Sequence, residues 1–215
     1  MSNSTHFWLI RHGETQWNAE KRLQGWRDIP LSSVGIKQAE VLGEYLRVET
    51  FDPPIDLVVS SDLARAHDTA CIATGHLGFP ILACAELRER SYGIYEGQAW
   101  AALDGLKAKN RLNLRDPDQD IDQGESLRTF QMRILAAFED LARRYKGRNI
   151  LVFSHGGVID VVWRKVSNLA VDAPRPHPIL NTSINNFSID ENGHWALKAW
   201  GCTSHLEKTT LDDII

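Results

Sequence analysis

Short apolar runs that end abruptly in polar residues are the main pattern along the chain. The clearest runs cover residues 7–10, 57–59 and 150–153. Each run is short and is bounded by glycine or polar residues, which is typical of a buried strand. The pattern therefore predicts three strands that enter a core and present polar side chains where they end.

Helical periodicity fills much of the chain between these runs. Apolar residues recur at three- and four-residue steps, and flanking Ser, Gly and Pro residues indicate where helices begin and end. We expect helices over residues 33–46, 63–77, 100–109, 127–145 and 158–167. In the first of these helices, the buried face is expected to carry Ile36, Ala39, Leu42 and Leu46.

Residues 184–189 and 195–200 flank Glu191-Asn192-Gly193, which predicts an antiparallel hairpin. Strands that alternate with helices indicate an α/β fold, to which the hairpin adds antiparallel pairing. An exposed edge at residues 184–189 could pair with a second copy of the chain and give a homodimer, although a covered edge is the simpler expectation. The polar stretch 110–124 lacks clear periodicity and is a candidate for a lid.

The polar residues at the strand ends are candidates for a binding site. Arg11 and His12 follow the first strand, and His155 follows the third. Arg65 lies one turn beyond the second strand. In open α/β sheets, ligands bind outside the carboxyl ends of the strands. Two permanent cations and two imidazoles at such an edge predict a site for a compact anion, most simply a phosphate.

The run Arg-His-Gly-Glu-Thr at residues 11–15, followed by Trp17 and Asn18, resembles the signature of the histidine phosphatase superfamily, also called the phosphoglycerate mutase-like family. The resemblance covers nearly the whole chain through further blocks at residues 30–32, 60–66, 87–89, 92–93, 96–97, 124–126 and 154–157. It implies a mixed, mostly parallel central sheet with helices on both faces and a small helical cap over the site. We expect a single domain of residues 1–215 with a cap or lid insertion at about residues 98–124.

The catalytic residues follow from this resemblance and from the chemistry of phosphoryl transfer. A neutral imidazole of His12 can attack phosphorus through Nε2 if an acceptor holds Nδ1–H and fixes the tautomer. The resemblance implies that the Gly13 carbonyl is this acceptor and that a phosphohistidine forms. It also implies that Glu89 is the general acid, with Glu86 and Glu96 as nearby alternatives. His155 is expected to stabilise the transferring group.

Phosphate binding is expected to involve further residues. Arg11 and Arg65 would clamp the phosphoryl oxygens with their planar guanidinium groups. The amide of Gly156 at a helix start suits an anion. Asn18 and Gln24 resemble auxiliary phosphate donors. Glu125 either belongs to the site or caps the helix that starts after Ser126.

Substrate selectivity is expected from the cap and from a proline-rich loop. The candidates are Trp100, Arg111 and Arg115 in the cap, and His177 in the loop. The segment up to Gly124 lacks the paired arginines and the lysine-rich insertion that mutases use to retain a bisphosphate, so the resemblance is closer to the phosphatase branch. It implies a metal-independent phosphomonoesterase that acts on a small phosphorylated metabolite.

Two alternatives stay open. The first is a 2,3-bisphosphoglycerate-dependent phosphoglycerate mutase, in which case 2,3-bisphosphoglycerate would be a cofactor; otherwise we expect none. The second is a non-catalytic homologue that binds phosphorylated ligands, which ranks low because His12, Glu89 and His155 are all present. We expect no metal, since no His-x-x-x-His pair or carboxylate triad accompanies the histidines.

Composition narrows the class of protein further. The chain has 215 residues, 43% of them hydrophobic, which suffices for one sizeable core. Its net charge of −4 disfavours nucleic-acid binding. The three cysteines have no C-x-x-C spacing, which argues against a disulfide framework or a zinc site and favours a cytoplasmic protein. The amino terminus does not resemble a signal peptide, and no apolar run approaches the roughly 20 residues of a membrane span.

Overall fold

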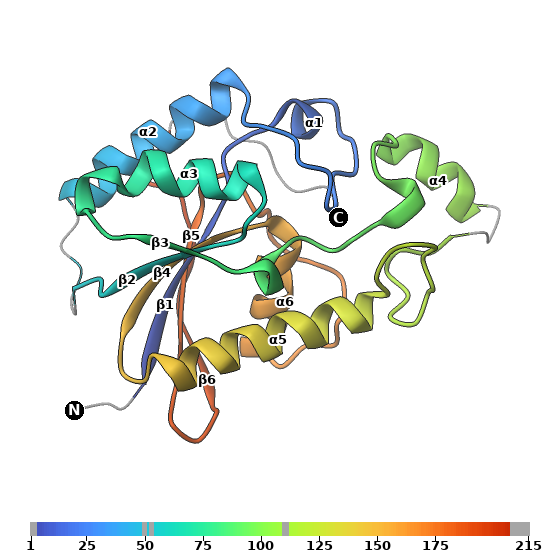
Figure 1. Cartoon of the computed structure of the whole chain (residues 1–215). Coiled ribbons are helices and arrows are strands. Elements are labelled where there is room, and N and C mark those ends of the chain that lie inside the picture. Colours follow the sequence, from blue (N-terminus) through green and yellow to red (C-terminus); the bar gives the residue numbers. More distant parts are fainter. Residues whose placement is uncertain (1–3, 49–50, 52–53, 109–111, 207–215) are drawn as a thin grey trace.

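The computed structural model describes residues 4–48, 51, 54–108 and 112–206. Within these residues, six strands form a mixed sheet in the order β3-β2-β4-β1-β5-β6 (Figure 1). Their bounds are β1 Thr5–Arg11, β2 Leu57–Ser60, β3 Ile81–Ala83, β4 Asn149–Ser154, β5 Ile184–Ile189 and β6 Trp195–Cys202. Strands β1 to β4 pair in parallel, whereas β5 is antiparallel to β1 and β6. The predicted α/β fold with a mostly parallel sheet is confirmed.

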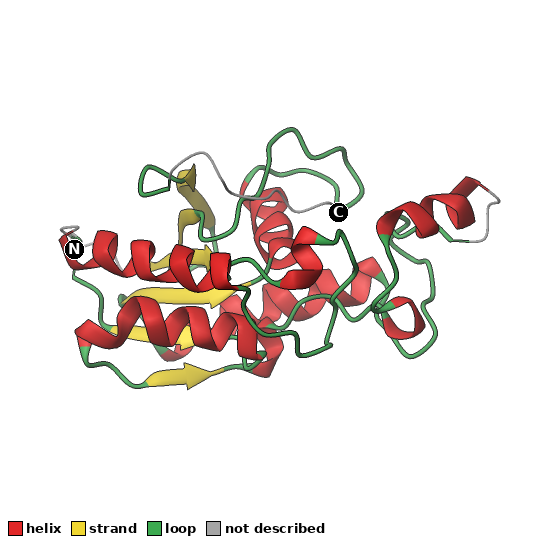
Figure 2. Cartoon of the chain, turned by 90° about the horizontal axis from the view of Figure 1, so that it is seen from above, coloured by secondary structure: helices red, strands yellow, loops and turns green. Residues whose placement is uncertain are grey.

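Long helices cover both faces of this sheet (Figure 1, Figure 2). One face carries α2 (Ser33–Val48) and α3 (Ala64–Thr74), and the other carries α5 (Leu127–Arg144) and α6 (Gly156–Val166). The shorter elements are α1 Gln16–Ala19, α4 Trp100–Ala108, and the 3-10 turns η1 Gly75–Leu77, η2 Ala85–Leu87 and η3 Gly93–Tyr95. No helix in the described part of the chain is long and apolar enough to cross a membrane.

Strand β1 shows why the central strands consist of continuous apolar runs. Phe7 and Leu9 belong to the core cluster that packs against α5 and α6, whereas Ile10 belongs to the cluster beneath α2 and α3. Because helices cover both faces, parallel strands cannot place polar residues on either side within the layers. Polar side chains are therefore confined to the strand ends, where the site lies.

Helix α2 confirms the predicted helix over residues 33–46 and continues to Val48. The Ser32 hydroxyl accepts a hydrogen bond from the Gly35 amide at 3.1 Å and so caps the helix. The expected burial of Ile36 is wrong, because its side chain is 43% exposed. Gly35 faces inward and approaches the backbone of Glu14, and the next residue lies about 100° further around the helix, toward solvent.

The predicted hairpin is confirmed, but its first strand is not an edge. β5 lies between β1 and β6, and both neighbours pair with it. The backbone groups that a second copy would need are therefore already used, so the suggested dimer contact at residues 184–189 is wrong. The edge of the sheet on this side is β6.

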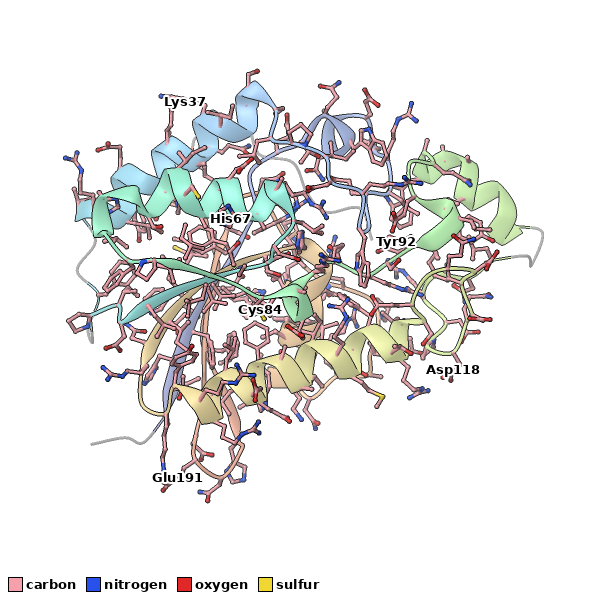
Figure 3. All side chains as sticks on the ribbon, viewed as in Figure 1. Lys37, His67, Cys84, Tyr92, Asp118 and Glu191 are labelled. Atoms are coloured by element: carbon pink, nitrogen blue, oxygen red, sulfur yellow. The ribbon has the colours of Figure 1, made fainter. Side chains whose placement is uncertain are left out.

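The segment expected to form a cap contains α4 and a loop, and α4 lies outside the two helical layers (Figure 2). It has an apolar cluster of its own, in which Leu103, Leu112 and Ile121 pack with Leu23 and Tyr92. Figure 3 shows Tyr92 between the sheet and α4. This segment is thus joined to the main body near the strand ends, while its assignment as a cap or lid stays a prediction.

Candidate active site

Three adjacent strands bring the candidate residues together. The order β2-β4-β1 places their carboxyl ends side by side. The pairing continues beyond the strands, since the His12 amide donates to Ser154 O and the Ser61 amide donates to Phe153 O, both at 2.9 Å. As a result, the ring centroids of His12 and His155 lie 5.2 Å apart.

His12 is buried at the end of β1 and lines a pocket. Its Nδ1 lies 2.7 Å from the carbonyl oxygen of Gly13, so Nδ1 carries the proton and Nε2 has the free lone pair. Burial holds the pKa of His12 well below its usual value, and the cations of Arg65 and Arg11 lower it further. The imidazole is therefore neutral at pH 7, as attack on phosphorus requires.

The loop that carries His12 is fixed from three sides. The Gly13 amide donates to Thr69 Oγ1 at 3.0 Å, and Asn181 Nδ2 donates to the His12 carbonyl at 2.9 Å. On the third side, Gly13 lies against Gly35 of α2 so closely that a Cβ on Gly13 would be 2.5 Å from Gly35 O. Thr69 and Asn181 were not expected to contribute, because they are far from His12 in sequence.

Arg11 and Arg65 are both buried and both line the pocket. Arg11 Nη1 donates to Ile179 O at 2.5 Å. Arg65 donates from Nη2 to Gly25 O at 2.8 Å and from Nη1 to Arg27 O at 2.9 Å. Its buried Nε has no hydrogen-bond partner among the described residues. Burial lowers the pKa of Arg65 to about 10, and nearby carboxylates oppose this shift, so the group stays charged at pH 7.

His155 is fully buried, and its Nε2 lies 2.9 Å from Ser61 Oγ. Burial lowers the pKa of His155 well below its usual value, with further contributions from Arg65 and His12. Nδ1 has no hydrogen-bond partner among the described residues. If the serine hydroxyl donates to Nε2, Nδ1 carries the proton and can donate to an anion. Ser61 belongs to a block noted in the sequence, but no role was predicted for it.

Glu89 is buried and contributes a carboxylate to the pocket. Its Oε1 accepts from the Arg90 amide at 2.8 Å and its Oε2 from the Gly157 amide at 3.0 Å. A Cβ on Gly157 would be 2.2 Å from Glu89 Oε1, so the glycine makes room for the carboxylate. Gly156, the first residue of α6, also lines the pocket.

The auxiliary donors Asn18 and Gln24 also line the pocket. Thr15 N donates to Asn18 Oδ1 at 3.0 Å, and Thr15 Oγ1 donates to Gln24 Oε1 at 2.9 Å. Because Thr15 engages both amide oxygens, the amide nitrogens are the groups that can donate to a ligand.

Of the three selectivity candidates that lie within the described residues, one lines the pocket. Trp100 lines it, whereas Arg115 is exposed and does not. His177 is absent from the pocket lining; its Nε2 accepts from Trp200 Nε1 at 3.1 Å, and its ring lies 4.4 Å from that of Trp163. Those tryptophans are on β6 and α6, so the proline-rich loop packs on the main body instead. Arg111 lies outside the described residues.

The structure also adds residues that the sequence did not single out for the site. Lys21, Arg22 and Tyr92 line the pocket together with Trp17. Arg22 is paired with Glu20 at 2.7 Å. Lys21 has a φ of +53°, which is uncommon for a residue with a side chain.

Glu125 does not cap α5. Its carboxylate pairs with Arg133 at 2.7 Å and accepts from the Ser91 amide at 3.0 Å, while Ser126 alone caps the helix through Thr129 N. Within the described residues, no group of three or more His, Cys, Asp or Glu side chains is arranged to hold a metal ion.

Comparison with known proteins identifies the family. The sequence model of the histidine phosphatase superfamily (branch 1) matches residues 7–203, and the chain belongs to this superfamily. It is 35% identical over 205 residues to phosphoglycerate mutase-like protein 4 of Arabidopsis thaliana, covering 94% of this chain and 86% of that protein. It is 33% identical over 209 residues to a metal-independent phosphoserine phosphatase of the same plant, covering 95% of this chain and 84% of that protein.

A solved structure shows the same fold. A mutant phosphoserine phosphatase from Entamoeba histolytica, in complex with phosphoserine, matches with a TM-score of 0.81 and 27% sequence identity, covering 94% of this chain and 100% of that one. The chain is therefore an enzyme of the phosphatase or mutase type.

Proposed function

We propose that the protein is a metal-independent phosphomonoesterase that hydrolyses a small phosphorylated metabolite through a phosphohistidine on His12. One observation carries this proposal: the pocket contains a buried, neutral His12 beside the cations of Arg11 and Arg65. A neutral nucleophile next to two permanent cations suits attack on a phosphate dianion, since the cations offset the charge that otherwise repels a nucleophile.

In the first step, His12 Nε2 forms a bond to phosphorus while the ester P–O bond breaks. The leaving alkoxide takes a proton from the carboxyl group of Glu89, and Gly13 O keeps the proton on Nδ1. In the second step, water attacks phosphorus, gives a proton to the Glu89 carboxylate, and breaks the P–N bond. Inorganic phosphate leaves, and both residues return to their starting states.

Glu89 must be protonated when the ester binds. Arg65 and the two amides that donate to its carboxylate favour the ionised form in the empty pocket. A phosphate dianion in the pocket would oppose this effect by repelling a second negative charge. We therefore propose that binding of the substrate itself favours the protonated carboxyl group of Glu89.

Lys21 supports a substrate with a second anionic group. Trp100 N donates to the Lys21 carbonyl at 3.1 Å, which fixes Lys21 beside the start of the cap. No hydrogen bond or ion pair joins its ammonium group to another described residue. The phosphoryl group itself would bind to Arg11 and Arg65, which are more deeply buried. One similar protein is named a phosphoserine phosphatase, and the structure of another contains phosphoserine, which carries a carboxylate.

We expect Lys21→Ala to lower kcat/KM for phosphoserine about tenfold. For phosphoethanolamine, which lacks the carboxylate, kcat/KM should stay within about twofold of the wild type. Lys37→Ala on the outer face of α2 is the matched control (Figure 3).

The mutase alternative also has an observation in its favour. Lys21 and Arg22 could hold the second phosphate of 2,3-bisphosphoglycerate, and a similar protein is named phosphoglycerate mutase-like. We rank it below the phosphatase because Arg115 of the cap is outside the pocket. Isomerisation of 3-phosphoglycerate, dependent on 2,3-bisphosphoglycerate and with little phosphate release, would favour it.

The test is phosphate release from nitrophenyl phosphate, measured with a chelator present for the wild type, His12→Ala and the control His67→Ala. We expect release that survives the chelator, is lost in His12→Ala, and is kept in His67→Ala, whose residue lies on α3 outside the pocket (Figure 3). Acid-labile phosphate trapped on the wild type but not on His12→Ala would identify the intermediate. Loss of activity with chelator would contradict the metal-independent mechanism. Ligand binding without turnover would favour the non-catalytic homologue.

A further inference from the structure

The segment that carries Glu89 has no regular structure to hold it. Glu89 lies between the 3-10 turns η2 and η3, and neither of these turns is longer than three residues. Backbone carbonyl groups in a segment of this kind need donors from elsewhere when they are buried. The position of the Glu89 backbone, which carries the carboxyl group, therefore depends on side chains from other elements.

Arg133 on α5 supplies most of these donors. Its Nη1 donates to Glu86 O at 2.7 Å and to Arg88 O at 3.0 Å, and its Nη2 donates to Glu89 O at 3.1 Å. The two remaining N–H groups bind the carboxylate of Glu125, from Nε at 2.8 Å and from Nη2 at 2.7 Å. All five N–H donors of this guanidinium group are thus engaged.

Glu125 extends this connection to the other side of Glu89. Its Oε2 accepts from the Ser91 amide at 3.0 Å, and its own amide donates to Ser91 O at 2.9 Å. The residues on both sides of Glu89 are therefore bound, directly or through Glu125, to Arg133. Arg133 itself is absent from the lining of this pocket, so its guanidinium group does not contact a substrate bound there.

Trp26 makes a second contact with the same carbonyl group. Its Nε1 donates to Glu89 O at 2.8 Å. The guanidinium groups of Arg88 and Arg133 lie 4.9 and 5.9 Å from the centre of its ring, within the range of cation–π attraction. Trp26 is 41% exposed, so its contact with Glu89 does not follow from burial in the core.

We propose that Arg133, assisted by Trp26, is a positioning residue that holds the carboxyl group of Glu89 at the leaving oxygen. This inference rests on the proposed function, in which Glu89 is the general acid. A general acid must lie within hydrogen-bond reach of the atom that it protonates, and small displacements are costly. A lysine keeps the charge but has three donors on a single nitrogen, and it cannot reproduce five contacts in a planar arrangement.

The test compares two leaving groups. An alkyl ester needs the proton from Glu89, whereas nitrophenolate is stable without one. We expect Arg133→Lys to lower kcat/KM about tenfold for an alkyl phosphate (phosphoserine or 3-phosphoglycerate, whichever the wild type hydrolyses faster) and by about twofold or less for nitrophenyl phosphate. Trp26→Phe, which keeps an aromatic ring but lacks the N–H donor, should also lower kcat/KM more for the alkyl ester than for the aryl ester, by a smaller factor than Arg133→Lys. Arg143→Lys, an exposed residue of the same helix, is the control and should match the wild type.

A double-mutant cycle with Glu89→Gln separates positioning from a purely structural role. If Arg133 acts through Glu89, adding Arg133→Lys to the Glu89→Gln variant should lower kcat/KM for the alkyl ester by less than about twofold. The inference would be overturned if Arg133→Lys lowered kcat/KM equally for both esters, or if its effect added fully to that of Glu89→Gln. Either result would leave the proposed function intact. If Glu89→Gln showed no preference for the aryl ester, or the wild type hydrolysed no alkyl ester, the acid role of Glu89 would fail and the inference with it.

Discussion

A single added methyl group at Gly35 is expected to disturb both the fold and the site. Gly35 lies in the first turn of α2, and a Cβ there would be 2.0 Å from the carbonyl oxygen of Glu14. Ordinary van der Waals contact begins at about 3.4 Å, so the backbone around Glu14 or α2 must move by about 1.4 Å. The atom met is backbone and not the flexible end of a side chain, so the strain cannot be relieved by rotating a side chain.

The cost can be estimated from overpacking in protein cores. We expect Gly35→Ala to lower the free energy of unfolding by about 1–3 kcal/mol. The gain that alanine normally brings to a helix interior, about 1 kcal/mol, does not offset a clash of this size. Because Glu14 is two residues from His12, we also expect kcat/KM for nitrophenyl phosphate to fall at least about tenfold at temperatures where the variant is folded.

Urea unfolding, followed by tryptophan fluorescence, measures the first effect. The matched control is Gly75→Ala at the end of α3, where no atom lies within 4 Å of the added Cβ and φ is −53°. This control should be as stable as the wild type or more stable by about 0.4–1 kcal/mol. If Gly35→Ala unfolded within about 0.5 kcal/mol of the wild type and kept its activity, the close approach of α2 to the His12 loop would not be rigid, and the reasoning would be refuted.

Three further predictions follow from other parts of the structure. Phe138→Ala should cost about 3–5 kcal/mol in urea unfolding, because this fully buried ring packs on three other aromatic rings; a loss under 1 kcal/mol would contradict that packing. Arg65→Lys should lower kcat/KM for nitrophenyl phosphate about 100-fold, since lysine lacks the planar fork, and a loss under fivefold would argue against the clamp. The pKa of His205 is lowered to about 4, mainly by burial, so the unfolded chain takes up a proton below about pH 6.5 that the folded protein does not. The free energy of unfolding should therefore decrease as the pH falls from 6.5 to 4. His205→Leu should make this decrease smaller in urea titrations, and an unchanged dependence of stability on pH would show that His205 does not contribute.

Local sequence determined much of the framework. The central strands are buried on both faces, so each is a continuous apolar run, and the polar residues after it have to lie at the strand end. The boundaries of α5 could be predicted from Ser126 and from the three- and four-residue steps of its apolar stripe. Arg11 ends β1, His12 directly follows it, and His155 directly follows β4. Their convergence could be predicted because parallel strands end at the same edge of the sheet.

Other features depend on contacts between distant parts of the chain. Strand order places β5 inside the sheet, and the pattern of β5 alone does not show whether a neighbour covers each side. The same limit applies to His177, whose loop packs on Trp163 and Trp200 and not over the pocket. Neither residue type nor spacing in the sequence distinguishes these outcomes.

Burial and periodicity within a segment thus predict the individual strands and helices and the residues that each strand delivers to the site, but not the order of the strands. The remote side chains that support these residues are set by how the elements pack together. Arg133 is 44 residues from Glu89 in the chain and yet donates to its carbonyl group. The physical reason is that a buried polar group takes whichever donor the packing of the helices on the sheet brings within reach, and that packing is a property of the whole fold.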